Sequence, residues 1–344
     1  MSKRAGVLPG WKSWGIRLIA FVLSLVVSGM FIVLISGLNP LSVFSEMING
    51  AIGSNKRTWV TIRDAMTLLC IAVGLAPAFK MRFWNIGAEG QILVGGIATA
   101  ACMIYLNSLP PLLLIIIMIV ASLAAGAIWG FLPGFFKAKW NTNETLFTLM
   151  MNYIAIQLTC FFVAKWENPF GSNSVGIINS QTKAGWLPNL LSDGYNRDFG
   201  WNVILVLAVT VFMYLYMNKS KHGYEIAVIG DSENTARYAG IRVNRAYVRT
   251  IVLSGAICGL AGFIAVSGAS HTISTSTAGG RGFTAIIVAW LAQFNSIVMI
   301  IFSFLIVFLQ KGAQAIASSY NLSQEVSEMI TGIILFFILG SEFF

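Results

Sequence analysis

The sequence predicts an all-α membrane protein, a polytopic transmembrane helical bundle of about ten spans with both termini in the cytoplasm. Of its 344 residues, 57% are hydrophobic and only 10% are charged, whereas a soluble domain carries about 25% charged residues. The hydrophobic residues also gather in runs close to the roughly 20 residues that a helix needs to cross the hydrocarbon core of a bilayer. We therefore expect residues 1–344 to form a single transmembrane domain.

The apolar runs define the expected spans, which are separated by polar or glycine-rich segments. We place the spans at 16–38, 64–79, 84–106, 112–132, 146–163, 201–217, 248–269, 283–294, 297–310 and 326–340. The segment 39–63 is expected to be a loop or a helix lying in the membrane interface. The eighth and ninth spans are short, so they can instead form a re-entrant pair, which a membrane tolerates where it is buried in protein.

The basic residues set the expected orientation. With ten spans, fourteen of the 22 Lys and Arg residues fall on the side of the N-terminus. Lys and Arg concentrate near the cytoplasmic ends of spans, so this bias, and not nucleic-acid binding, explains the excess of positive charge. The loop 218–246 is then cytoplasmic and the loop 164–200 is external. The aromatic residues of the external loop suit either a docking surface or an aromatic belt at the interface.

The loop 218–246 is the longest polar, basic interruption in the second half of the chain. Within it, Asp231 or Ser232 can cap a helix by accepting an N–H of the first turn. Glu233 then stands where the helix dipole favours an anion, and Gly240 is a typical residue for a helix stop. A helix of about two turns is too short to be stable alone in water. We therefore expect it to need packing and a partner surface outside the membrane.

Polar residues also open the third span, in the stretch FWNIGAEGQ at 83–91. A carboxylate inside a bilayer is expensive and usually pairs or faces a cavity. Glu89 is therefore a candidate for a translocation path or gate, or equally for an interfacial cap paired with Arg82 or water. Polar and aromatic residues within spans can line a path for a small polar solute, or equally make helix-to-helix hydrogen bonds. Besides Glu89, these candidates are Asn85, Gln91, Asn152, Tyr153, Gln157 and Trp290.

Two glycine-containing stretches carry further expectations. The glycine-rich turn around Arg281 can bind an anion, but an interfacial anchor on a flexible loop is the favoured interpretation. Gly255, Gly259 and Gly262 share one helix face at the spacing of small residues that favours close helix packing.

The sequence contains no pattern for hydrolytic or metal chemistry, so we predict neither an enzyme nor a metal site. Its two histidines, His222 and His271, are expected on opposite sides of the membrane, and no Walker A, HExxH or GxSxG pattern occurs. An ion-coupled secondary transporter is the alternative of another class. It would need several acids inside the spans as relays, whereas Glu89 is the one clear case and Asp64 lies at a membrane edge.

Three stretches resemble the integral-membrane permease subunits of bacterial ABC importers, in the branch that serves simple sugars, nucleosides and branched-chain amino acids. They are FWNIGAEGQ at 83–91, HGYEIAVIGDSENTARYAGI at 222–241 and GGRGFTAIIVAWLAQFN at 279–295. The resemblance covers about residues 60–340 and is greatest to the nucleoside-uptake permeases. It implies a multi-pass subunit of the bacterial inner membrane that moves a small polar solute. A nucleoside is favoured over a simple sugar such as ribose or galactose.

The resemblance also implies partners. Two permeases, of the same or of different chains, form the channel, and an extracytoplasmic substrate-binding protein delivers the solute. Separate ABC ATPase subunits bind ATP and magnesium, so no cofactor is expected on this chain. The family's coupling helix, which contacts the ATPase, maps onto Gly230, Asp231, Ser232, Glu233, Asn234, Ala236, Arg237, Tyr238, Ala239, Gly240 and Ile241. Thr235 stands where a typical coupling loop has Pro, which leaves the helix prediction unchanged.

Overall fold

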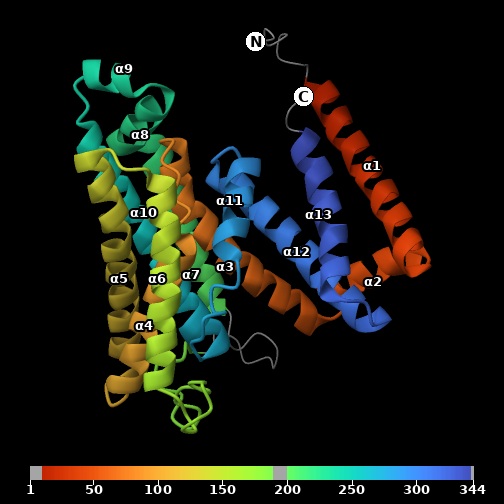
Figure 1. The fold of residues 1–344 in the computed structure, drawn as a ribbon, viewed down its shortest axis with the longest axis horizontal. Helices are drawn as coiled ribbons and strands as arrows, with labels where there is room; N and C mark the ends of the chain where they lie inside the picture. Colours follow the sequence, from red (N-terminus) through yellow and green to blue (C-terminus); the bar gives the residue numbers. More distant parts are fainter. Residues whose placement is uncertain (1–9, 189–199, 342–344) are drawn as a thin grey trace. The chain divides into compact units, whose positions relative to one another are not determined.

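The computed structural model describes residues 10–188 and 200–341, and every regular element within them is a helix (Figure 1). The chain divides into two compact units, one made of residues 1–61 and 305–344 and the other of residues 62–304. Two long helices, α3 and α12, contribute residues to both units.

Within the described residues, seven helices are long and apolar enough to cross a membrane. They are α3 (Asn55–Lys80), α4 (Ala88–Tyr105), α5 (Pro111–Trp140), α6 (Glu144–Lys165), α7 (Gly200–Lys219), α10 (Val243–Ala265) with its π-helical end η1 (Val266–Ser270), and α12 (Ser296–Tyr320). An eighth is obtained if α1 (Gly10–Ser36) and α2 (Pro40–Ile52), which are bent by 107°, form one broken span. The predicted polytopic helical bundle is confirmed, whereas the number of ten spans stays a prediction.

The helix α11 (Arg281–Leu291) occupies the place of the expected eighth span and has 11 residues. At 1.5 Å per residue it rises about 16 Å, roughly half the thickness of a hydrocarbon core. This length agrees with re-entry for the eighth expected span, whereas α12, at the ninth, is long and apolar enough to cross, so a re-entrant pair of both stays a prediction. The next helix, α12, continues to Tyr320, ten residues beyond the expected end of the ninth span. Lys311, the residue after the expected end, lies inside the helix.

In the unit 62–304, α10 packs tightly against α4 and α5, and α6 runs beside them (Figure 1). Gly255, Gly259 and Gly262 carry this contact. A Cβ added at any of the three would lie within 3.0 Å of backbone atoms of α4 or α5, closer than Cβ atoms approach in real structures. The close packing that the glycine spacing predicts is therefore confirmed, and it lets three long helices share one buried seam.

In the unit 1–61 with 305–344, the bend between α1 and α2 is directed by local residues. Gly37 has a φ of +66°, which a residue with a Cβ rarely adopts. The side chain of Asn39 then accepts the N–H of Leu41 at 3.0 Å, and Pro40 occupies the first helical position, for which its fixed φ is suited. The segment 39–63, expected as a loop or an interfacial helix, is thus helical as α2 and the first turns of α3.

The described part of the expected external loop, residues 166–188, packs against the end of α10. The hydroxyl of Ser267 donates to the carbonyl of Gly185 at 2.6 Å. The ring of Trp186 stacks on His271 with 3.8 Å between centroids and 3° between planes. Figure 1 shows this loop at one end of the helices and α8 and α9 at the other. The predictions that fall on residues 189–199 of the loop lie outside the described residues.

Candidate functional site

The loop 218–246 contains two helices, α8 (Lys221–Asp231) and α9 (Glu233–Tyr238). The sequence analysis missed α8. Its start is marked by Ser220, whose hydroxyl accepts the N–H of Gly223 at 3.1 Å, which is an ordinary N-cap signal. The two glycines and the short apolar run within it hid the helical pattern.

The end of α8 lies directly against the end of α3. A Cβ added at Gly230 would come within 3.0 Å of the carbonyl oxygen of Lys80, the last residue of α3. The same helix α8 is also joined to α10, because the carboxylate of Glu225 accepts a hydrogen bond from Arg249 of α10 at 2.8 Å. That bond holds the pKa of Glu225 below its usual value, so the carboxylate is ionised at neutral pH. The segment is therefore fastened to two candidate membrane spans.

The structure confirms the boundaries of the short helix α9 that local signals predict. Of the two candidate caps, Ser232 is the one used, and its hydroxyl accepts an N–H of the first turn at 3.3 Å. Gly240 has a φ of +76°. Its N–H donates to the carbonyl of Arg237, and the N–H of Ile241 donates to the carbonyl of Ala236, both at 3.0 Å. This pair of bonds is the Schellman arrangement that ends many helices.

One face of α9 holds the helix in place and the other is open. Ala236 is fully buried, and Glu233 receives bonds from Arg237 at 2.6 Å and from the hydroxyl of Tyr247 of α10 at 3.4 Å. Tyr238 is 94% exposed. Of the eleven residues predicted to contact an ATPase, the exposed ones are Asp231, Glu233, Asn234, Arg237, Tyr238, Ala239 and Gly240. Gly230 and Ala236 are buried and pack within this segment and against α3.

Three of the predicted path residues lie together in the interior and bond to one another or to neighbouring helices. The amides of Asn85 and Gln91 face each other at 3.4 Å, and Asn85 also donates to the hydroxyl of Ser254 at 3.1 Å. Asn152 of α6 accepts the N–H of Gly90 at 2.9 Å. These contacts are the helix-to-helix hydrogen bonds that the sequence left as the alternative to a path lining.

The other path candidates lie apart from this group. Tyr153 and Gln157 are exposed on α6 although Asn152 beside them is buried, because successive residues of a helix point about 100° apart. Trp290 of α11 is 45% exposed and packs against Trp84 with 5.8 Å between ring centroids. The structure therefore does not gather all the candidates around one cavity.

Glu89 is buried, and its carboxylate accepts the N–H of Gly282 at 2.8 Å in the first turn of α11. The positive end of the helix dipole and the free N–H groups of a first turn both favour an anion there. Gly282 allows the approach, since a Cβ at this position would lie within 3.0 Å of the backbone nitrogen of Glu89. Glu89 thus caps another helix, whereas the sequence analysis had considered Arg82 or water as its partner.

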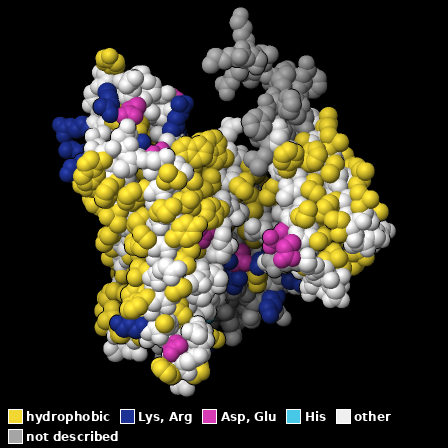
Figure 2. Space-filling view, viewed as in Figure 1, with side chains coloured by type: hydrophobic (Ala, Val, Ile, Leu, Met, Phe, Trp, Pro, Cys, Tyr) yellow, Lys and Arg dark blue, Asp and Glu magenta, His cyan; other side chains and the backbone are white. Residues whose placement is uncertain are grey.

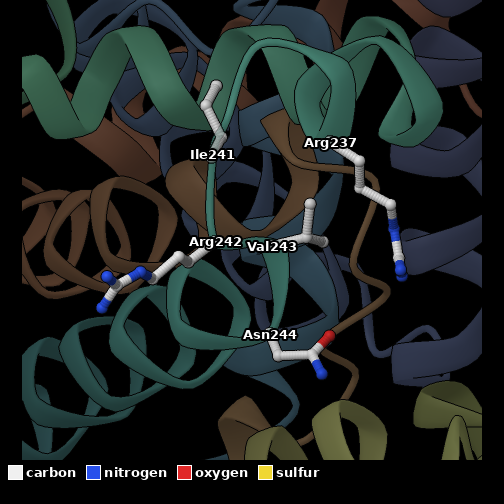
Figure 3. Close-up of a pocket in the computed structure, with 5 residues that line it drawn as sticks. All are labelled: Arg237, Ile241, Arg242, Val243 and Asn244. Atoms are coloured by element: carbon white, nitrogen blue, oxygen red, sulfur yellow. The ribbon is translucent and has the colours of Figure 1, made fainter.

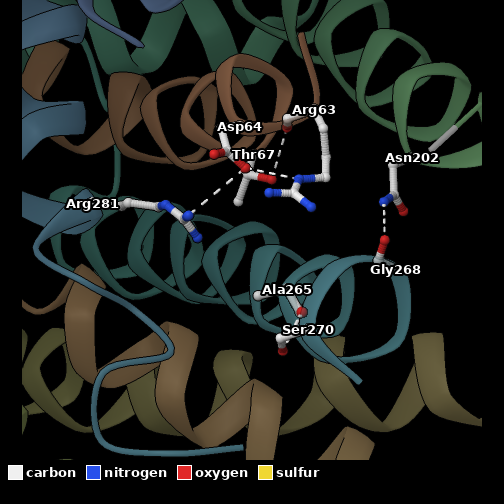
Figure 4. Close-up of polar contacts among 8 residues, drawn as sticks. All are labelled: Arg63, Asp64, Thr67, Asn202, Ala265, Gly268, Ser270 and Arg281. Atoms are coloured by element: carbon white, nitrogen blue, oxygen red, sulfur yellow. Dashed lines mark hydrogen bonds and ion pairs between the residues drawn. The ribbon is translucent and has the colours of Figure 1, made fainter. Parts of the chain in front are cut away.

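Arg281 precedes this capped turn and points toward Asp64 of α3, as Figure 4 shows. Its Nη2 lies 3.9 Å from Asp64 Oδ1, and the same oxygen accepts a bond from Arg63 Nε at 2.8 Å. Asp64 is 6% exposed. The glycine-rich turn therefore brings its arginine to a carboxylate within the protein. Because the partners are far apart in the sequence, no local pattern could have revealed this cluster.

Comparisons with known proteins place the chain among transport permeases. The family model described as "Branched-chain amino acid transport system / permease component" matches residues 59–339. A guanosine ABC transporter permease protein of Bacillus subtilis is 29% identical over 95% of this chain and 93% of the relative. A nucleoside ABC transporter permease protein of Lactococcus lactis is 27% identical over 94% and 90%. A glucose ABC transporter permease protein of Haloferax volcanii is 25% identical over 98% and 90%. No solved structure matches the chain.

Proposed function

Because the chain belongs to the family of branched-chain amino acid transport system permease components, we propose that it is the membrane-spanning subunit of an ABC importer. The observation that carries this proposal is the α8–α9 segment. Its short helix is capped at both ends, held by the buried Ala236, and presents an almost fully exposed Tyr238. An exposed aromatic residue on a rigid support is typical of a protein contact, and the contact we propose is a separate ATPase subunit.

The proposed solute is a nucleoside. Two of the relatives are named for guanosine and nucleoside transport. The exposed pair of Trp84 and Trp290, whose ring planes lie 30° apart, offers aromatic surface on which a nucleobase can stack. A simple sugar is the second candidate, because the Haloferax relative is named for glucose and sugars also pack against aromatic rings.

The mechanism follows from the fastening of the α8–α9 segment. ATP binding closes the ATPase pair and moves the segment as one piece. The close approach of Gly230 to Lys80 passes the movement to α3. The bonds from Arg249 to Glu225 and from Tyr247 to Glu233 pass it to α10. ATP then shifts the permease between two states because it favours the contacts of one of them.

We further propose the surroundings of this subunit. It lies in the bacterial inner membrane with ten spans and both termini in the cytoplasm. It pairs with a second permease, which is a further copy or a different chain. The ATPase carries ATP and magnesium, and an extracytoplasmic binding protein delivers the solute to the end of the helices where residues 166–188 lie. This end is opposite α8 and α9 (Figure 1).

Uptake by proteoliposomes that contain the permease, its pairing partner and the candidate ATPase tests the proposal, with guanosine and glucose as labelled solutes and the binding protein added. We expect ATP-dependent guanosine uptake that persists when an ionophore collapses the proton and sodium gradients. Uptake of glucose and not guanosine under the same conditions would make a sugar the solute, and it would leave the importer proposal unchanged. Uptake that needs an ion gradient and proceeds without ATP would contradict the importer class and favour an ion-coupled secondary transporter.

A further inference from the structure

A cavity of about 430 Å³ lies between α8, the turn at 239–241 and the first two turns of α10. It shares Glu225 and Arg249 with the contacts that fasten α8, and its other basic residues take no part in the contacts described above. The charged or titratable side chains that line it are Lys221, His222, Glu225, Arg242, Arg245 and Arg249. Four of these are permanently basic and one is acidic, which leaves three positive charges without a balancing carboxylate in the lining. Figure 2 shows dark blue Lys and Arg side chains over the end of the molecule where α8 and α9 lie.

The ion pairs of the cavity divide the basic residues into two kinds. Arg249 is bound to Glu225 at 2.8 Å, and His222 Nδ1 lies 3.6 Å from the same carboxylate. Among the described residues, Lys221, Arg242 and Arg245 form no ion pair. The Nε of Arg249 is also buried, and no residue that the structure describes forms a hydrogen bond with it. The bond between Arg249 and Glu225 holds the wall of the cavity in place. The side chains of Lys221, Arg242 and Arg245 are available to bind an anion.

The position of the cavity along the helices indicates its depth in the membrane. Arg242 immediately precedes α10, and Arg245 and Arg249 lie in its first two turns. Lys221 follows the end of α7 by two residues. Since α7 and α10 are both candidate membrane spans, we expect the residues at these helix ends to lie near the lipid phosphates. Basic pockets between span ends on the cytoplasmic side are typical sites for anionic headgroups.

We propose that this cavity binds the phosphate group of an anionic membrane lipid. Guanidinium groups form paired hydrogen bonds to phosphate oxygens, and the volume is sufficient for a phosphate with its glycerol. The lipid would fasten the base of the α8–α9 segment to the membrane surface. This role goes beyond solute transport. The cavity shares the turn at 239–241 with the predicted ATPase contact, but its basic side chains come from outside α9. Arg242 and Arg237 extend in different directions from the α9–α10 junction (Figure 3).

Native mass spectrometry of the purified chain tests the proposal, with phosphatidylglycerol and the zwitterionic phosphatidylcholine titrated separately. The test variant is Arg242→Gln with Arg245→Gln. The matched control is Arg82→Gln with Lys139→Gln, which also removes two exposed basic residues. Arg82 lies just beyond the end of α3, and Lys139 lies in the last turn of α5. We expect the test variant to bind phosphatidylglycerol about 25-fold more weakly, from about fivefold for each basic residue removed. The control and all phosphatidylcholine binding should be unchanged.

Four results would overturn the proposal. Wild-type protein could bind both lipids equally, or the control could lose as much affinity as the test variant. Inorganic phosphate at millimolar concentration could displace the lipid fully, which would assign the cavity to a soluble phosphate. The test variant could keep its phosphatidylglycerol and lose the ATPase, which would assign the cavity to a protein. If the double variant does not fold, the exposed single variant Lys221→Gln takes its place, with an expected fivefold loss. The lipid titration itself is done without the ATPase, whose binding is measured separately, so a failed lipid titration leaves the importer proposal standing.

Discussion

Replacing Gly240 by valine should loosen the end of α9 without creating a clash. A Cβ built on Gly240 has no atom within 4 Å, so space is not limiting. The cost arises from the φ of +76°, which a residue with a Cβ adopts at an expense of about 1–2 kcal/mol. Because about 1.4 kcal/mol is a factor of ten, the closed end of α9 should become about 5- to 30-fold less populated relative to open forms.

Hydrogen exchange measures this change directly. The N–H groups of Gly240 and Ile241, which bond to the last turn of α9, should exchange faster in Gly240→Val by about the same 5- to 30-fold. ATP-driven uptake should fall in parallel. The control is Gly240→Asn, since asparagine tolerates the left-handed conformation better, and it should behave almost like the wild type. Wild-type exchange and uptake in the valine variant would refute the account of this helix end.

Three further predictions concern the fastening of the fold. Glu89→Gln should lower stability by about 1–2 kcal/mol, because a neutral amide interacts less with the start of α11, while uptake is retained. Lost uptake at an unchanged melting temperature would instead make Glu89 a relay. Gly259→Ala should lower the yield of folded protein, because its Cβ meets the backbone of α5. Gly332→Ala, in open space on α13 (Gln324–Ser341), should be tolerated. The lowered pKa of Glu225 means that its ion pair with Arg249 stabilises the fold above the usual value of 4.5 and is lost as the pH falls through the folded pKa. Thermal unfolding in mild acid should therefore depend less on pH in Glu225→Gln.

The features that the sequence predicted well depend on neighbouring residues. The long apolar runs identify most of the spans, and the spacing of Gly255, Gly259 and Gly262 identifies the packed face of α10. Ser232 and Gly240 mark the two ends of α9 because capping is a contact between residues a few positions apart. The end of an apolar run was a poorer guide to the end of a helix. The ninth expected span ended at residue 310, but α12 continues to Tyr320.

The features that the sequence could not predict depend on contacts between distant segments. The pairing of Asp64 with Arg281 and the capping of α11 by Glu89 join residues that no local pattern connects. The path residues stay a prediction. Polarity along the sequence cannot tell the buried Asn152 from the exposed Tyr153, since only the packing of α6 decides which side faces the interior.

The affinity of the purified ATPase for the permease carrying Tyr238→Ala tests the central claim most directly. Tyr238 is 94% exposed, so its truncation should leave the permease folded. The control is Tyr153→Ala, which removes a ring that is 59% exposed on α6. If α9 is the contact, the first variant should bind the ATPase at least about tenfold more weakly, as the loss of an aromatic anchor does, and the control should bind normally. Equal binding by both variants would contradict the claim that α9 joins this permease to its ATPase.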